Sequence, residues 1–148
     1  MHVVSSPDGF IARKDNSVSW LAANGSIYEA GVSISAEEAA TFVKAIDCYV
    51  LGSRTYEHPL ELGWPYGDTP TVVVTGRKLP STRKSVDFYS GDLKPLLDEK
   101  LAPRYRNIWL VGGAILSEHF LELGFVDEIR LTIAPVYCMT DGGYSVVL

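Results

Sequence analysis

The stretch that decides the fold reads Asn107-Ile-Trp-Leu-Val-Gly-Gly-Ala-Ile-Leu-Ser-Glu-His-Phe-Leu-Glu-Leu-Gly-Phe-Val-Asp-Glu-Ile-Arg-Leu-Thr-Ile-Ala-Pro135. An apolar run at 108–111 breaks at Gly112-Gly113, apolar residues then recur at helical spacing as far as Gly124, and an alternating run covers 128–133. This pattern predicts a strand, a glycine turn, a helix and a second strand. A helix that begins at a glycine turn directs free N–H groups and the positive end of its dipole into the space above the strand. An anionic group, most simply a phosphate, is therefore the expected ligand.

Two further strands are predicted to end at glycine, hydroxyl and cationic residues. The continuous apolar runs at 48–51 and 71–74 are typical of strands buried on both faces. They lead into Gly52-Ser53-Arg54-Thr55 and Thr75-Gly76-Arg77-Lys78. Because ligands of parallel α/β sheets bind beyond the carboxyl ends of the strands, the three junctions together predict a site for a ligand with several phosphates.

The rest of the chain supplies strands and helices in alternation. Ser35 is the expected N-cap of a helix over 36–46, with Glu38 at the capping-box position. The other expected elements are strands at 1–4 and 86–89, a helix over 92–100, and irregular segments at 22–33 and 57–70. Connections too long for hairpins imply right-handed crossovers, and so an α/β fold with a central, mostly parallel sheet and helices on both faces.

Length and charge limit the classes of partner. The 148 residues are expected to form a single domain, 1–148, long enough to bury roughly 70% of its unfolded surface. Thirteen basic and 18 acidic residues give a net charge of −5, so nothing favours nucleic acid or an anionic membrane as partner. With no signal peptide and no apolar run near the ~20 residues of a membrane span, a cytoplasmic protein is predicted. A small molecule is the expected partner.

Several kinds of chemistry find no support in the residue pattern. Cys48 and Cys138 stand beside apolar residues and are predicted to be buried and reduced. His2, His58 and His119 lack the spacing of metal ligands, so no metal site is expected. The sequence also has no Walker loop, spaced GxGxxG or nucleophile elbow, which disfavours hydrolase and nucleoside-triphosphatase functions.

Five motifs, taken in order, resemble those of a known family. They are Val3-Val4-x-x-x-Asp8-Gly9-Phe10-Ile11-Ala12 followed by Trp20, Val50-Leu-Gly-Ser-Arg-Thr-Tyr-Glu57, Val72-Val-Val-Thr75, Ile108-Trp-Leu-Val-Gly-Gly-Ala-Ile-Leu116, and Val126-Asp-Glu-Ile-Arg-Leu-Thr-Ile-Ala-Pro-Val136. Together they resemble the dihydrofolate reductase-like superfamily. Within it, the likeness is to the reductase domain of the bifunctional riboflavin-biosynthesis protein (the RibD C-terminal domain) and its stand-alone bacterial relatives.

The resemblance implies a three-layer dihydrofolate reductase-like fold and NADPH as cofactor. It places the cofactor's phosphates at Gly52, Ser53, Arg54 and Thr55, and the adenosine 2′-phosphate near Thr75, Gly76 and Arg77. The pyrophosphate is expected over the glycine turn and helix start, at Gly112, Gly113, Ala114, Ile115 and Leu116. The nicotinamide is expected beside Ile11 and Ala12. Charge-assisted hydrogen bonds from Arg54, Arg77 and Lys78 would explain a preference for the 2′-phosphorylated cofactor.

Substrate and proton-donor positions are less defined. True dihydrofolate reductases carry a carboxylate on the helix after the tryptophan, which makes Glu37 and Glu38 catalytic candidates, with Asp8 as a third. Each has a simpler explanation, because Asp-Gly forms turns and the glutamates suit a helix N-terminus. Trp20 and Tyr56 are candidates for stacking on a flat substrate or, equally, for core packing.

The chain also departs from the family pattern. Ser53 stands where arginine is common, and Ala114 is the third residue of the glycine turn. Relatives continue through further strands after the position of the last residue here, so a sheet lacking some C-terminal strands is expected. An exposed edge strand is a liability unless a partner covers it, and we expect a homodimer.

The expected activity is hydride transfer from NADPH to a pyrimidine- or pterin-related heterocyclic substrate. The nearest named reaction is the riboflavin-pathway reduction of a phosphoribosylamino-uracil to its ribityl form. Two alternatives stay open at this point: a nucleotide-binding module of the same fold without turnover, and a true dihydrofolate reductase.

Overall fold

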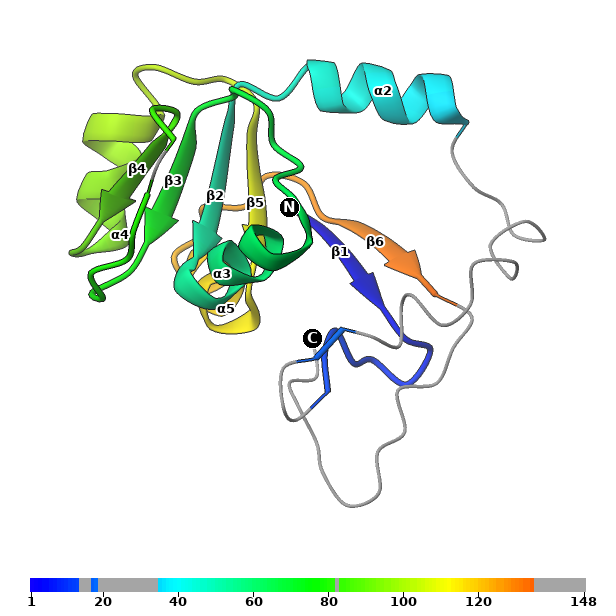
Figure 1. Cartoon of the computed structure of the whole chain (residues 1–148). Helices are drawn as coiled ribbons and strands as arrows, with labels where there is room; N and C mark the ends of the chain where they lie inside the picture. Colours follow the sequence, from blue (N-terminus) through cyan, green and yellow to red (C-terminus); the bar gives the residue numbers. More distant parts are fainter. Residues whose placement is uncertain (14–16, 19–34, 82, 135–148) are drawn as a thin grey trace.

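The computed structural model describes residues 1–13, 17–18, 35–81 and 83–134 (Figure 1). The expectations for Trp20, the 22–33 segment, Cys138 and any strands after residue 134 lie outside these ranges. None of the helices within them is both long and apolar enough to cross a membrane.

Four parallel strands form the main sheet. In spatial order they are β4 (Val86–Tyr89), β3 (Thr71–Val74), β2 (Cys48–Gly52) and β5 (Ile108–Gly112). Val50 of β2 lies opposite Val72 of β3 and Leu110 of β5, which sets the register across the centre. Central β2 is buried along Cys48 to Leu51, as its continuous apolar run predicts.

Alternation along β2 divides the core into two layers. The short α4 (Leu93–Pro95) leads directly into a π-helical turn, η2 (Leu96–Leu101), and α5 spans Ala114–Glu122. Cys48 and Val50 face a cluster that includes Leu96 and Leu101 of η2 and Phe120 of α5. Tyr49 and Leu51 face the opposite cluster, which holds Tyr56 of α3 (Ser53–Leu62) together with Trp64 and Tyr66. Helices therefore cover both faces of the sheet, and the three-layer prediction is confirmed.

Two more parallel strands form a separate small sheet beside β5. β1 (His2–Ser5) pairs with β6 (Arg130–Ile133), with His2 opposite Arg130. Within the described residues β1 is hydrogen-bonded to β6 and not to β5, although β1 and β5 lie side by side (Figure 1). The sequence predicts one central sheet, whereas the described residues form two: a sheet of four strands and a sheet of two. Leu131 and Ile133 on β6 are exposed, while the homodimer stays a prediction.

The capping-box prediction for the helix before β2 is confirmed. α2 spans Ala36–Lys44, and Ser35 Oγ accepts a hydrogen bond from Glu38 N–H (3.1 Å) while Glu38 Oε2 accepts one from Ser35 N–H (2.8 Å). Both N-terminal donors are thereby satisfied reciprocally. The helix ends at Lys44, two residues before the end of its apolar stripe, because the last turn of a helix readily frays.

One prediction about local structure is wrong. The segment from residue 57 was expected to be irregular because it is rich in proline and glycine, yet α3 continues through Pro59 as far as Leu62. Its first turns are fixed by tertiary contacts, above all the buried Tyr56 ring, and such contacts override local propensity. The chain leaves the helix at Gly63, whose φ of +110° favours glycine.

Cys48 is a packing residue. Its side chain is fully buried in the core and its thiol is free. Burial raises the pKa of the thiol to about 12, so the reactive thiolate is scarce at neutral pH. The prediction of a buried, reduced cysteine is confirmed at this position.

Candidate functional site

The three predicted junctions meet at one edge of the main sheet. β3, β2 and β5 are neighbours, and all three run in the same direction. Gly52 lies opposite Val74, and Leu51 lies opposite Gly112, so the strands end almost level. Helices α3 and α5 start at this edge, beyond the arrowheads of β2 and β5 (Figure 1).

The junctions after β2 and β5 approach each other closely through their glycine backbone. A Cβ atom added to Gly113 would lie 3.4 Å from Thr55 Oγ1, and one added to Gly52 would lie 3.8 Å from the carbonyl oxygen of Gly112. Gly112 itself has φ +120°, a conformation that other residues rarely adopt. Because these positions carry no Cβ atom, a ligand could approach their backbone closely.

Two helices begin at these two junctions. α5 has Gly113 as its N-cap, and the bond from Ser117 N–H to the Gly113 carbonyl (3.0 Å) starts its ladder, so the N–H groups of residues 114–116 precede it. α3 starts directly after Gly52. The side chain of Leu116 is buried in the core and that of Ile115 is 62% exposed, so these residues offer a ligand mainly their backbone N–H groups. The arrangement suits phosphate groups.

The third junction carries a charge pair that the sequence reasoning missed. Thr75 Oγ1 accepts a hydrogen bond from Arg77 N–H (3.0 Å), which shapes the turn after β3. The Arg77 guanidinium donates two hydrogen bonds to the Glu57 carboxylate, NH1 to Oε2 (2.8 Å) and NH2 to Oε1 (2.7 Å). These bonds lower the pKa of Glu57 and raise the pKa of Arg77. The sequence carries no signal for this pair, because Glu57 and Arg77 are 20 residues apart and meet only through the adjacency of β2 and β3.

Tyr56 is a packing residue, which corrects its assignment as a substrate contact. The side chain is 1% exposed, and its hydroxyl donates a hydrogen bond to the Pro80 carbonyl (2.8 Å). Its ring meets Trp64 and Phe88 edge to face, at centroid distances of 5.9 and 5.5 Å. With the ring enclosed and the hydroxyl bonded, no face remains for a ligand.

Replacing Tyr56 by phenylalanine should lower stability without changing ligand binding. The substitution removes the hydroxyl and leaves the Pro80 carbonyl without that donor, which costs about 1 kcal/mol. Urea unfolding measures the loss, and Tyr89→Phe is a matched control because the Tyr89 hydroxyl donates to the exposed Asp92 carbonyl (2.8 Å). A clear change in nucleotide affinity for Tyr56→Phe would restore a role in the site.

The structure does not bring the glutamate candidates to the junctions. Glu37 and Glu38 lie in the first turn of α2, which sits at the end of the sheet where the strands start, opposite α3 and α5 (Figure 1). The carboxylate of Glu38 is engaged in the capping box, and the hydrogen bond from Ser35 N–H lowers its pKa. Their described role is helix capping and helix-end charge.

Asp8 lies in a tight turn after β1, as Asp-Gly predicts. Gly9 N–H donates to the Ser6 carbonyl (2.9 Å), Ser6 N–H donates to the Phe10 carbonyl (2.8 Å), and Gly9 has φ +84°. Ile11 and Ala12 follow this turn. It lies beyond the end of β1, on the side of the molecule that holds the glycine junctions (Figure 1).

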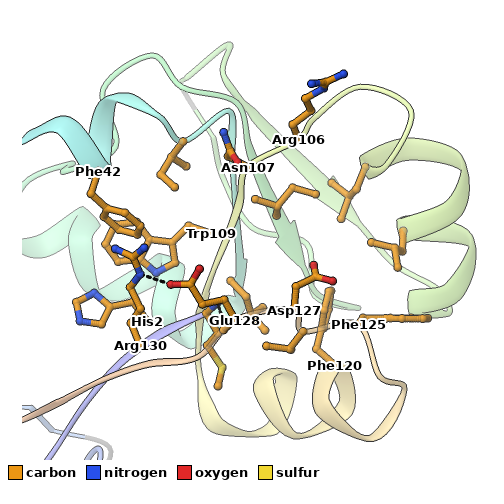
Figure 2. A pocket seen from close by; sticks show the side chains of 17 residues that line it. His2, Phe42, Arg106, Asn107, Trp109, Phe120, Phe125, Asp127, Glu128 and Arg130 are labelled. Atoms are coloured by element: carbon orange, nitrogen blue, oxygen red, sulfur yellow. Dashed lines mark hydrogen bonds and ion pairs between the residues drawn. The ribbon is translucent and has the colours of Figure 1, made fainter. Parts of the chain in front are cut away.

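A pocket of about 330 Å³ lies elsewhere, between the two sheets (Figure 2). Its walls come from the starts of β1, β5 and β6, from α2 and α5, and from the segment before β6. The lining residues include His2, Phe42, Asn107, Trp109, Phe120, Phe125, Asp127, Glu128 and Arg130. The rings of His2 and Phe42 meet that of Trp109 at 5.6 and 5.1 Å, and Arg130 pairs with Glu128. Since this is the amino-terminal end of the strands, the pocket is separate from the junction site.

The architecture and the three junctions define a dihydrofolate reductase-like α/β domain. Residues 1–138 match the model of the RibD C-terminal domain, and the chain belongs to this family. It is similar to an uncharacterized protein of Bacillus subtilis (strain 168), YwjB, at 30% identity over 138 residues, covering 92% of this chain and 75% of YwjB. A second uncharacterized protein of that organism, YyaP, is 58% identical over 31 residues, which cover 21% of this chain and 16% of YyaP.

A solved structure supports the same fold. The chain is similar to a protein of Shewanella sp. PV-4 that is provisionally assigned to riboflavin biosynthesis. The TM-score is 0.71 at 21% identity, covering 92% of this chain and 76% of the other. At this identity the likeness shows the fold.

Proposed function

We propose that this chain is an NADPH-dependent reductase that transfers hydride to a pyrimidine- or pterin-related heterocycle, with a phosphoribosylamino-uracil as the first substrate to test. The observation that carries the proposal is the close approach of Gly52 and Gly112-Gly113 at the carboxyl edge of the sheet, where helices α3 and α5 begin. Membership of the RibD C-terminal domain family supports it. The open backbone fits the phosphates of a dinucleotide.

The proposal gives each junction a binding role. The backbone at Gly52–Thr55 and 113–116 would hold the pyrophosphate, the turn at 75–77 with Arg54 would hold the 2′-phosphate, and Ile11 and Ala12 would flank the nicotinamide. When bound, the cofactor supplies the hydride, so the protein's contribution is binding, orientation and one proton. Of the three carboxylates considered, Glu37 and Glu38 belong to the first turn of α2, whereas Asp8 belongs to the turn that follows β1, and we propose Asp8 as the polar group near the ring.

Binding and turnover test the proposal separately. NADPH should quench the fluorescence of the tryptophans, Trp109 among them. Calorimetry should give the same affinity for NADPH as the fluorescence titration. Absence of binding at high micromolar NADPH would sink the reductase function. If NADPH binds but neither a phosphoribosylamino-uracil nor dihydrofolate oxidises it, a nucleotide-binding module or another substrate is favoured. Turnover of dihydrofolate alone would indicate a true dihydrofolate reductase.

Replacing Arg54 and Arg77 by alanine should narrow the preference for NADPH over NADH by roughly 10- to 100-fold. A charge-assisted hydrogen bond contributes about 1.5–3 kcal/mol, and because both side chains are exposed, the two together should contribute about 1.4–2.8 kcal/mol. Dissociation constants for both cofactors give the ratio. Replacing Arg104, an exposed arginine beyond η2, by alanine is the control. An unchanged ratio would mean that other residues contact the 2′-phosphate.

A further inference from the structure

The Glu57–Arg77 pair occupies the place where the proposed function puts the cofactor's 2′-phosphate. Both terminal nitrogens of the guanidinium are engaged, at 2.8 and 2.7 Å from the two carboxylate oxygens. This paired geometry is also how a guanidinium binds a phosphate. A carboxylate and a phosphate cannot both take the same edge of Arg77.

Charge makes the conflict stronger. Glu57 places a carboxylate at a junction that also carries Arg77 and, next in the sequence, Lys78. Arg54 is close enough to act electrostatically on Glu57, and it adds to the lowering of the Glu57 pKa that Arg77 causes. A 2′-phosphate bound among these cations would stand beside a carboxylate of the same sign, and like charges at this range repel.

The pair is built to open readily. The side chains of Arg77 and Glu57 are 57% and 38% exposed, and ion pairs with this much solvent access contribute little to stability. The Arg77 backbone does not depend on Glu57, because Thr75 Oγ1 holds its N–H group independently. Loss of the ion pair therefore frees the guanidinium without removing the support of the turn.

We propose that Glu57 sets the cofactor preference by occupying Arg77 until a 2′-phosphate displaces it. This inference rests on the proposed function. It predicts that Glu57 weakens binding of every 2′-phosphorylated nucleotide and leaves nucleotides without that group unaffected. In a positioning role, by contrast, Glu57 would strengthen the binding of 2′-phosphorylated nucleotides by holding Arg77 in place.

Calorimetry with two small nucleotides separates these roles. Adenosine 2′,5′-bisphosphate carries the 2′-phosphate and adenosine 5′-monophosphate lacks it. The Glu57→Gln variant should bind the bisphosphate ~10-fold more tightly than the wild type, an effect that shrinks as salt screens the charges, and should bind the monophosphate equally well. Asp98→Asn is the matched control, because it makes the same charge change in the exposed Lys94–Asp98 pair (2.6 Å) outside the site. Equal or weaker bisphosphate binding by Glu57→Gln overturns the proposal.

A second readout follows the carboxylate itself. An NMR titration of Glu57 in the wild-type protein should give a pKa that rises toward the ordinary value of a glutamate when the bisphosphate binds, because Arg77 is withdrawn and a phosphate approaches. A pKa that stays low contradicts displacement. If the wild type binds neither the bisphosphate nor NADPH, the proposed function fails and the Glu57 inference with it. If NADPH binds and Glu57→Gln behaves as wild type, only the Glu57 inference fails.

Discussion

A Gly113→Val variant should bind NADPH at least ~100-fold more weakly than the wild type while remaining folded. The backbone at Gly113 has φ −73° and ψ −168°, which valine adopts without strain. Its Cβ would lie 3.4 Å from Thr55 Oγ1, so the branched side chain would cover the backbone where the two glycine junctions meet. A ligand held there by backbone N–H groups would lose access to them.

Calorimetric titration with NADPH measures the loss, and urea unfolding should show a stability change of about 1 kcal/mol or less, the scale of an altered N-cap. Gly113→Ala should have a smaller effect on binding, since one methyl group covers less of the backbone than an isopropyl group. Ala102→Val adds comparable bulk at an exposed position and is the control. Wild-type affinity in Gly113→Val would mean that the phosphates lie elsewhere.

A Leu51→Ala variant should lose about 3 kcal/mol of unfolding free energy, within the range of about 2–5 kcal/mol for buried leucines. Leu51 is fully buried on central β2, where it packs with Tyr56 and Val73 in the layer under α3. Truncation removes its burial and leaves a cavity between elements that cannot easily close.

The same substitution on the outer strand is the control. Leu131 lies on β6 and is 53% exposed, so Leu131→Ala should change stability by no more than about 0.5 kcal/mol. Urea unfolding of both variants gives the comparison. Similar losses at the two positions would contradict the described core, in which β2 is buried on both faces and β6 is exposed.

The sequence predicts well those features that are fixed by neighbouring residues. The strand, glycine turn and helix around Gly112-Gly113 and the capping box between Ser35 and Glu38 depend on contacts within a few positions, and both are present. The shared edge of the three junctions also follows, because parallel strands joined by crossovers must end on the same side.

Features that depend on which elements become neighbours were harder to predict. Glu57 meets Arg77 only because β2 and β3 are adjacent, and a separation of 20 residues in the chain gives no sign of it. Tyr56 could not be assigned from residue type, since an aromatic ring suits a pocket and a core equally. The helical course of the chain through Pro59 depends on packing that local propensity does not describe.

The division between the main sheet and the β1–β6 pair has a consequence for amide hydrogen exchange. β2 has a hydrogen-bonded strand on each side, whereas β1 is bonded to β6 alone within the described residues. The small sheet can therefore open as a unit while the main sheet stays closed, and its amides should exchange with solvent sooner. Asp8, Ile11 and Ala12 follow β1, while the three glycine and threonine junctions follow strands of the main sheet. A dinucleotide bound to both the turn after β1 and the junctions of the main sheet would hold the small sheet closed. It should therefore slow amide exchange most in β1 and β6, at positions that it does not contact.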